Sequence, residues 1–397
     1  MSTRVEVIGV GMVKFAKPGA SEPYEIMASK AIRLALDDAS VAYEDVGQAY
    51  ASYVFGDSAC GQAALYRIGM TGIPLVNVNN NCSSGSSALL LARQAILSGA
   101  VDCALAFGFE EMRPGALGPV WNDRTSQLME LESQLEQIWP DVRPAPNAHR
   151  LFGAAACAYI EKTGANPDIF AKVAVKTRTH AMNNPLAIFT SPLTVEEVMN
   201  SPLIFAPYLR RLEACPPSSG AAAAVLCTPA FARQHGLRRS VSIRAQAMAT
   251  DRAASRKSAI DLSGADMTRN AARQVFEQAG IGPEDIKVVE LHDCFTSNEV
   301  ISYEGLGLCA EGGAERLIAA GDNTYGGKYV INPSGGLMSK GHPLGATGLA
   351  QCTELVTQLR GEAGARQVAG AKLALQHNLG LGGACVVTLY ETSHLGG

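Results

Sequence analysis

The chain has 397 residues; 47% of them are hydrophobic, 18% are charged and 40 are glycine. This composition is typical of a globular protein with a large core, and the length allows two or three domains. The formal net charge is −4 and no basic run stands out, which argues against nucleic acid or an anionic membrane surface as a partner. The ten cysteines include no C-x-x-C pair, as is usual for reduced thiols. No signal peptide or uninterrupted membrane-length apolar run is visible, so we expect a soluble cytoplasmic protein without membrane insertion.

Strand-like and helix-like segments alternate along the chain, which predicts an α/β fold. In the first part, short apolar runs alternate with segments that carry small apolar residues at helical spacing. We expect strands at Val5–Val13, Leu75–Asn79 and Cys103–Gly108, and helices at Pro23–Ser40 and Ser83–Ser98.

The region from about residue 113 to 205 differs in character from its surroundings. It holds an acidic segment, several prolines and an Asn-Asn-Pro turn signal, so we interpret it as an insertion of helices and loops. The apolar block Gly220–Cys227 resumes a core strand. We therefore predict an N-terminal half formed by 1–115 plus 206–238, an inserted domain at 116–205, and a C-terminal half at 239–397.

The alternation restarts in the last third of the chain. We expect strands and helices in the following order: Ser242–Ala247, the helix Met267–Ala279, Ile286–Leu291, Val330–Asn332, the helix Gly345–Gln358, Lys372–Gln376 and Ala384–Tyr390. Each half then contains a strand, a loop of Asn, Ser and Gly, and a helix of small residues, at 76–95 and again at 330–355. This similarity suggests an internal duplication.

Cys82 is the first candidate for chemistry. It follows a strand ending at Asn79, and a serine- and glycine-rich turn leads from it into a long apolar helix. The positive field at a helix N-terminus lowers the pKa of a thiol, and free backbone amides there can bind an oxyanion. We therefore expect a nucleophilic thiolate; the alternative is a buried cysteine with a structural role.

His342 lies between a glycine and a proline, so it is held on a tight loop. A histidine in this position can act as a general base for a thiol or donate to a developing oxyanion. The alternative is a histidine that makes only surface hydrogen bonds.

A third cluster, His292-Asp293-Cys294-Phe295, directly follows a predicted strand. Because alternate residues of an extended segment point the same way, His292 and Cys294 are expected to face one pocket. A metal site would need two further ligands, and no second Cys/His pair supplies them, so we expect no metal. The dinucleotide fingerprint fails near Gly11 and no Walker motif is present, so no nucleotide cofactor is expected.

Taken together, these segments resemble the thiolase superfamily, and most closely its sterol-carrier-protein-x (lipid-transfer-protein) type. The similarity runs nearly end to end, and its most specific parts are Asn79–Ser87, His292–Phe295 and Gly326–Gly348. The resemblance implies the thiolase fold, in which two duplicated α/β halves form an α-β-α-β-α stack with an inserted loop domain.

The resemblance also implies roles for single residues. Cys82 matches the nucleophile that carries the acyl group, and His342 matches the histidine of the Gly-His-Pro motif that activates it. Many thiolases have a second catalytic cysteine where this chain reads His377–Gly380. In the sterol-carrier type the cysteine of the His-Asp-Cys-Phe motif fills that role, so Cys294 is the expected acid/base. His292 is then expected to position a water in the oxyanion hole.

Further residues follow from the same resemblance. Phe152, Gly153 and Phe295 lie where family members line the tunnel for the pantetheine arm, and the backbone amide of Gly380 is a candidate oxyanion donor. Coenzyme A is implied as co-substrate, with no permanently bound cofactor. A homodimer or homotetramer is expected.

The implied function is cleavage of a 3-oxoacyl-CoA by CoA, or the reverse Claisen condensation, through an acyl-Cys82 intermediate. Branched or sterol side-chain acyl-CoA in lipid β-oxidation is the implied substrate class. The alternatives are a decarboxylating 3-oxoacyl synthase, an aldol lyase of 3-hydroxyacyl-CoA with a partner protein, and a non-catalytic acyl-CoA- or lipid-binding protein. The presence of all four expected residues favours the thiolase.

Overall fold

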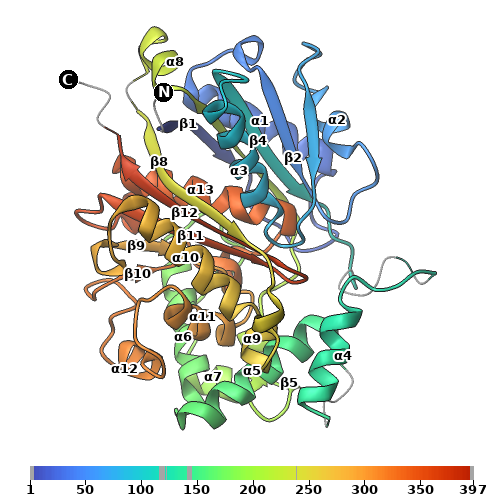
Figure 1. Ribbon diagram of the computed structural model, residues 1–397, viewed down its shortest axis with the longest axis vertical. Coiled ribbons are helices and arrows are strands. Elements are labelled where there is room, and N and C mark those ends of the chain that lie inside the picture. Colours follow the sequence, from blue (N-terminus) through green and yellow to red (C-terminus); the bar gives the residue numbers. More distant parts are fainter. Residues whose placement is uncertain (1–3, 116–120, 122, 141–144, 238, 394–397) are drawn as a thin grey trace.

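The computed structural model describes residues 4–115, 121, 123–140, 145–237 and 239–393 (Figure 1). Its main feature is a hydrogen-bonded sheet of ten strands. In chain order these are β1 (Val5–Met12), β2 (Gln48–Ser52), β3 (Leu75–Val78), β4 (Cys103–Glu110), β7 (Gly220–Cys227), β8 (Val241–Ala249), β9 (Val288–Glu290), β10 (Val330–Ile331), β11 (Leu373–Gly380) and β12 (Ala384–Thr392).

The strand order reveals the duplication. Across the sheet the order is β10-β9-β11-β12-β8-β1-β7-β4-β2-β3, so that β1 and β8 join two sets of five. In the first set β2 runs parallel to β3 and β4, and β7 runs antiparallel to β4 and β1. In the second set β9 runs parallel to β10 and β11, and β12 runs antiparallel to β11 and β8. The two sets share one topology, which confirms the predicted duplicated halves.

The helices cover these strands. The first half carries α1 (Tyr24–Ala39), α2 (Cys60–Leu65), α3 (Ser84–Leu97) and α8 (Pro229–Gln234). The second carries α9 (Ala259–Leu262), α10 (Ala265–Ala279), α11 (Thr296–Gly305), α12 (Ala314–Ala319) and α13 (Leu344–Arg360).

Between β4 and β7 the chain forms α4 (Met129–Ile138), α5 (Asn147–Thr163), α6 (Asp168–Ala181), α7 (Val195–Met199) and the small ribbon β5–β6 (Leu203–Phe205, Leu209–Arg210). These helices gather at one end of the molecule, beside the second half (Figure 1). The predicted domain limits remain a prediction. In the described part of the chain, no helix has both the length and the apolarity to cross a membrane.

Helices α3 and α13 form the central layer. Along β7 the even-numbered residues Ala222, Ala224 and Leu226 pack into a core with α3 and α13, and the odd-numbered residues pack against α1 and α8. The two central helices approach closely because a glycine of one meets glycines of the other: a side chain at Gly85 would lie 2.9 Å from the carbonyl oxygen of Gly345. The layered arrangement expected from the resemblance is thus confirmed.

Each predicted strand and helix is observed, with ends that differ by at most two residues except at one functionally important end. The strand predicted at Lys372–Gln376 continues to Gly380, because its residues up to Gly380 pair with β12. His377 and Asn378 therefore belong to a buried strand and not to a loop.

Candidate active site

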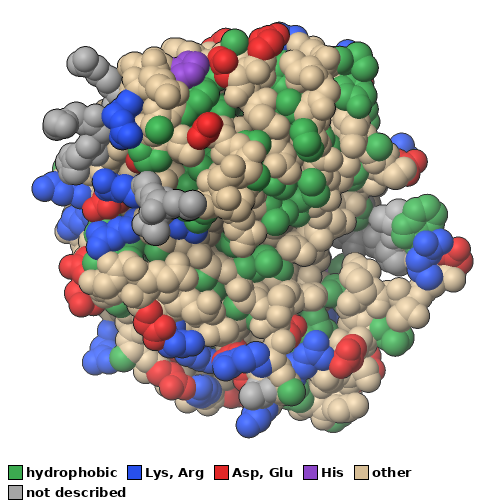
Figure 2. All heavy atoms as spheres, turned by 45° about the horizontal axis from the view of Figure 1, so that its top comes forward, with side chains coloured by type: hydrophobic (Ala, Val, Ile, Leu, Met, Phe, Trp, Pro, Cys, Tyr) green, Lys and Arg blue, Asp and Glu red, His purple; other side chains and the backbone are tan. Residues whose placement is uncertain are grey.

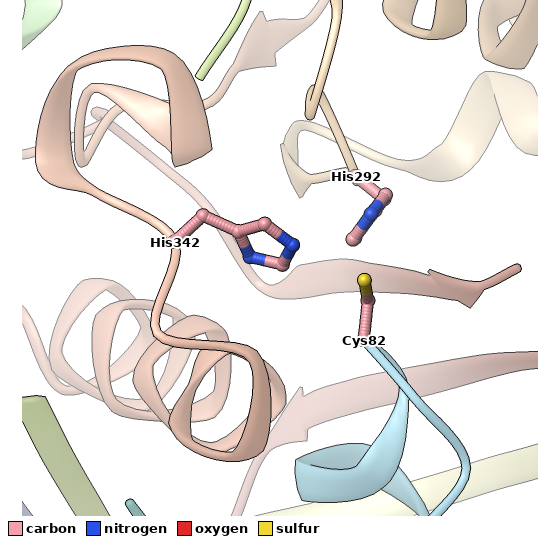
Figure 3. Close-up of side chains that lie close together, drawn as sticks. All are labelled: Cys82, His292 and His342. Carbon is pink, nitrogen blue, oxygen red and sulfur yellow. The ribbon is translucent and has the colours of Figure 1, made fainter. Parts of the chain in front are cut away.

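Four segments that follow or end strands meet at one place. Cys82 follows β3, His292 follows β9, His342 lies between β10 and α13, and Asn378 is near the end of β11. Cys82 and His342 each stand two residues before a central helix, α3 or α13, so they occupy equivalent positions in the two halves. The Cys82 sulfur and one ring nitrogen of each histidine lie within 4.8 Å of one another (Figure 3). The fold thus brings together three of the four side chains predicted to be catalytic.

His342 presents a free nitrogen to this group. Its backbone N–H donates to Ser218 Oγ at 3.0 Å, and its Nδ1 lies 2.7 Å from Thr347 Oγ1. The Thr347 hydroxyl donates its own hydrogen to the carbonyl of Pro343 at 2.9 Å, so it must accept from Nδ1–H. Nε2 is then the unprotonated nitrogen, and this buried atom has no partner in the described structure. It is available as a base, and burial lowers the pKa of His342 to about 3.

Cys82 departs from the expectation made from its sequence position. The residue retains some exposed surface, but its thiol lies deep in the protein, where burial first and then the Glu110 carboxyl raise its pKa to about 12. The predicted lowering of the pKa by the helix N-terminus is therefore wrong for the resting protein, since desolvation disfavours the thiolate more than the helix field favours it. The thiol donates only a long contact, 3.7 Å, to Asn81 Oδ1.

The two pKa shifts predict how Cys82 reacts with an alkylating agent. A thiol with a pKa near 12 stays protonated, and an imidazole with a pKa near 3 stays neutral, throughout the neutral range. The rate of Cys82 alkylation by iodoacetamide should therefore rise steadily from about pH 6 to pH 9, because the thiolate fraction grows about tenfold per pH unit. Labelling followed by peptide mass spectrometry measures this rate, and a plateau below pH 9 would show that a low-pKa thiolate exists instead.

His292 is oriented by the end of β11. Its Nδ1 lies 3.1 Å from the Asn378 side-chain nitrogen, and its backbone N–H donates to His377 Nδ1 at 3.3 Å. The rings of His292 and His342 meet edge to face, with centroids 5.1 Å apart and an interplanar angle of 81°. Burial lowers the pKa of His292 well below its ordinary value, and the neighbouring His342 and His377 lower it further. His292 is therefore neutral and carries one ring proton.

Cys82, His292 and His342 together have the spacing of a metal site. The argument from sequence that no further ligands were available is therefore wrong, because the fold supplies them from distant segments. The hydrogen bonds around His292 nevertheless do not suit a metal. Metal-bound histidines donate their second nitrogen to an acceptor, whereas Nδ1 of His292 accepts from an amide and Nε2 carries the proton. Neither ring nitrogen of His292 keeps a free lone pair for an ion.

Cys294 lies close to this group but outside it. Its sulfur does not join the three atoms that lie within 4.8 Å of one another in the described structure. Its carbonyl accepts from the backbone N–H of Cys215 at 2.9 Å. Burial, followed by the thiols of Cys215 and Cys82, raises the pKa of Cys294 well above its ordinary value. Cys294 is thus a protonated thiol in the same electrostatic environment as Cys82.

The residues predicted to line a tunnel are buried. The rings of Phe152 and Phe295 stack with centroids 5.0 Å apart. At Gly153 a side chain would meet the ring of Phe205 at 2.3 Å, and at Gly380 it would meet the carbonyl oxygen of Asn80 at 2.2 Å. Both glycines are therefore required for close packing, and Gly380 holds the end of β11 against the Cys82 loop. Roles of these four residues in substrate binding remain predictions.

Sequence reasoning missed several residues that hold the site. Thr347, Asn378 and Glu110 were not singled out, although all three are buried polar residues. Glu110 accepts from the backbone N–H of Gly345 at 3.0 Å at the start of α13. For Glu110, the available signal was a polar residue at the end of an otherwise apolar strand.

Comparison with known proteins agrees with this geometry. Residues 5–204 match the thiolase N-terminal domain family, and residues 246–390 match the thiolase C-terminal domain-like family. Sterol carrier protein 2 of Homo sapiens is 53% identical over 394 residues, covering 98% of this chain and 72% of that protein. Acetyl-CoA acetyltransferase of Methanothermobacter thermautotrophicus is 36% identical over 98% of this chain and 99% of that protein.

Solved structures share the fold. The structure of the Ltp2-ChsH2(DUF35) aldolase has a TM-score of 0.84 at 22% identity and covers 99% of both chains. That of human mitochondrial 3-ketoacyl-CoA thiolase has a TM-score of 0.74 at 17% identity, covering 98% of this chain and 99% of that one. Fold, site and relatives together define an acyltransferase enzyme. The chain belongs to the thiolase family, with sterol-carrier-type relatives, as the sequence predicted.

Proposed function

We propose that the chain is a thiolase that cleaves 3-oxoacyl-CoA with free CoA, or catalyses the reverse condensation, through an acyl-Cys82 intermediate. One observation carries the proposal: a neutral thiol lies beside the unpartnered Nε2 of His342 and a ring nitrogen of His292. This arrangement provides a nucleophile, its base and a hydrogen-bond donor in one buried group.

In the first half-reaction, His342 Nε2 takes the proton from the Cys82 thiol as sulfur attacks the 3-oxo carbon. The bond between C2 and C3 then breaks, and its electron pair forms the enolate of the departing acyl-CoA. The N–H groups of His342 and His292, the latter through a water, stabilise the enolate oxygen. The thiol of Cys294 supplies the proton that C2 takes up, and the acyl group stays on Cys82.

In the second half-reaction, CoA attacks the acyl-Cys82 thioester and Cys294 takes the proton from the CoA thiol. The tetrahedral oxyanion is stabilised by the backbone amides of Cys82 and Gly380. Expulsion of the Cys82 sulfur, with return of a proton from His342, releases the shortened acyl-CoA. All protons are exchanged among the chain's own side chains and CoA, so coenzyme A is the co-substrate and no bound cofactor is required.

The name of the relatives and a pair of buried rings beside Cys294 support one substrate class. Sterol carrier protein 2 is a name that refers to sterols, and the stacked pair Phe152–Phe295 offers an apolar surface near Cys294. These features support a bulky or branched 3-oxoacyl-CoA from lipid degradation. Competition between straight-chain and 2-methyl-branched substrates would test this assignment.

The activity is tested by incubating the chain with a 3-oxoacyl-CoA, with and without free CoA, and separating the CoA esters by chromatography. We expect two shorter acyl-CoA products only when CoA is present. Cleavage of a 3-hydroxyacyl-CoA without CoA would instead identify an aldol lyase. Binding without any turnover would identify an acyl-CoA-binding protein.

Cys294 gives a more specific prediction. Cys294→Ala should lower kcat by about 10²-fold, because an acid/base group contributes about 10²–10⁴-fold to rate. Alkylation of Cys82 in this variant should stay within about threefold of normal, since the nucleophile and its base remain. Steady-state kinetics and labelling measure the two effects separately.

Cys215→Ala is the matched control for this prediction. Cys215 is the neighbouring thiol, and its backbone N–H donates to the Cys294 carbonyl. We expect its kcat to stay within about threefold of normal. Equal losses in the two variants would remove Cys294 from the proposed acid/base role.

A homodimer or homotetramer is also proposed. Strand β3 is last in the strand order, so its outer edge has no strand neighbour among the described residues. Large apolar side chains are exposed on or near it: Tyr66 at 53%, Met70 at 76% and Val76 at 42%. Figure 2 shows hydrophobic side chains gathered on the side of the molecule where Figure 1 shows α2. Sedimentation equilibrium would test association of two copies.

A further inference from the structure

Asn378 occupies a position that the proposed mechanism does not use. By its resemblance to the thiolases, the segment His377–Gly380 stands where many of them have a second catalytic cysteine, and here the position offers an amide. Asn378 is fully buried on β11, between the Cys82 loop and the ring of His292. Its side-chain nitrogen lies 3.1 Å from the carbonyl oxygen of Cys82 and 3.1 Å from Nδ1 of His292. One amide therefore contacts both the nucleophile's backbone and the histidine.

The orientation of this amide is determined by its neighbours. The nitrogen must face the Cys82 carbonyl, since a carbonyl only accepts hydrogen bonds. On its other side the Asn378 oxygen accepts from Ser86 Oγ at 2.8 Å. Ser86 Oγ in turn accepts from the side-chain nitrogen of Gln376 at 2.8 Å, so its own hydrogen is free to point toward Asn378.

The same chain of donors continues to the next strand. Tyr390 on β12 donates its hydroxyl hydrogen to the side-chain oxygen of Gln376, which fixes the Gln376 amide. All members from Tyr390 to Asn378 are fully buried. Ser86 belongs to α3 of the first half and the others to the second half, so the chain of hydrogen bonds crosses between the halves.

The consequence for His292 concerns its proton. An amide N–H aimed at Nδ1 requires a lone pair on Nδ1, so the single ring proton must reside on Nε2. In this tautomer Nε2–H is a hydrogen-bond donor. The opposite tautomer would place two N–H groups against each other in a buried site, which is unfavourable.

We propose that Asn378 is a positioning residue: its amide, oriented through Ser86, Gln376 and Tyr390, holds His292 as the Nε2–H donor and ties the Cys82 loop to the same strand. This inference rests on the proposed function for its effect on rate. The tautomer of His292 is a property of the resting protein, so this part of the inference is independent of the proposed function. Partners that orient the ligands of metal sites change affinity or activity by about 10–100-fold when replaced, and we expect an effect of that size here.

The direct test is nitrogen-15 NMR of histidine-labelled protein at neutral pH, with His292→Asn used to assign the resonances. In the wild-type chain we expect Nδ1 of His292 unprotonated and Nε2 protonated. In Asn378→Asp, the carboxylate keeps an acceptor for Ser86 but replaces the donor by an acceptor, so Nδ1 should become protonated. A protonated Nδ1 in the wild-type chain, or an unchanged ring in Asn378→Asp, would overturn the proposal.

Kinetics provide the second readout. Asn378→Asp should lower kcat by about 10–100-fold and leave KM within about threefold. When Asn378→Asp is introduced into the His292→Ala variant, the fold-loss of kcat should be at least tenfold smaller than the fold-loss that Asn378→Asp causes in the wild-type chain. The reason is that part of its effect passes through His292. If the fold-losses of kcat in the two single variants multiply fully in the double variant, Asn378 and His292 act independently and the proposed coupling is overturned.

A matched control separates positioning from lost stability. Ser242 on β8 donates to Glu6 at 2.7 Å in an equally buried bond without contact to the site. Ser242→Ala should lower the melting temperature but leave kcat and the His292 resonances unchanged. If the wild-type chain cleaves no 3-oxoacyl-CoA and yet shows Nδ1 unprotonated, the proposed function fails while the role of Asn378 in fixing the tautomer stands.

Discussion

Cys82→Ala is expected to lower kcat for CoA-dependent cleavage by about 10⁴-fold or more, because no acyl-enzyme can form without the sulfur. The substitution removes a small side chain beside His292 and His342 and leaves their hydrogen bonds in place. The folded structure should therefore persist, and substrate binding should change little. Steady-state kinetics together with thermal unfolding measure both properties.

Cys60→Ala is the control for this loss. Cys60 is a buried cysteine on α2, outside the group formed by Cys82 and the two histidines. The kcat of Cys60→Ala should stay within about threefold of normal. A Cys82→Ala protein that kept more than about a hundredth of the activity would exclude covalent catalysis by this residue.

His342→Ala should lower kcat by about 10³-fold, since it removes both the base for Cys82 and an oxyanion donor. The rate of Cys82 alkylation should stay within about threefold of normal, because iodoacetamide reacts with the thiolate that forms by proton loss to solvent and not with a thiol activated by His342. KM should change much less than kcat if substrate is held mainly by other residues. Kinetics and labelling on one protein preparation give all three values.

Thr347→Val separates the contribution of the base, His342, from that of the hydroxyl that orients it. The substitution removes the hydroxyl that accepts from His342 Nδ1–H but keeps the imidazole. The loss of kcat in Thr347→Val should be smaller than the loss in His342→Ala. A fall of less than about tenfold in His342→Ala would show that Cys82 is activated by another group.

Much of the fold was predictable from local patterns. The strand Gly220–Cys227 was predicted with its observed bounds, and α3 differs from the predicted helix only by its two terminal serines. Apolar runs and alternating apolar residues carry this information. The spacing of apolar residues is a local property of the sequence, and it indicates whether one face or both faces of an element are buried. The duplication followed from similar segments in the two halves, and the shared strand order confirms it.

The polar interior was not predictable in the same way. Helix α11 has Thr, Ser, Asn and Glu in its first turns, and it is buried because its partners come from far along the chain. Glu299, for example, pairs with Lys176 of α6. Local sequence patterns do not show such pairing, so a polar segment of this kind is interpreted as solvent-exposed.

The site was predictable in its members but not in its electrostatics. Cys82, His292 and His342 were named from motifs and a family resemblance, and the fold brings them together. The direction of the Cys82 pKa shift was wrong because burial by distant segments outweighs the nearby helix terminus. Asn378 was hidden because the polar pair His377–Asn378 looks like a loop, although it lies in a buried strand.

Peptide mass spectrometry shows directly whether Cys82 carries the acyl group. The chain is mixed with a 3-oxoacyl-CoA in the absence of free CoA, quenched in acid, digested and mapped. We expect a mass increase equal to the shortened acyl group on the peptide that contains Cys82, and its loss when CoA is added. Cleavage of the substrate with no acyl group on Cys82, or with the group on Cys294, would contradict it.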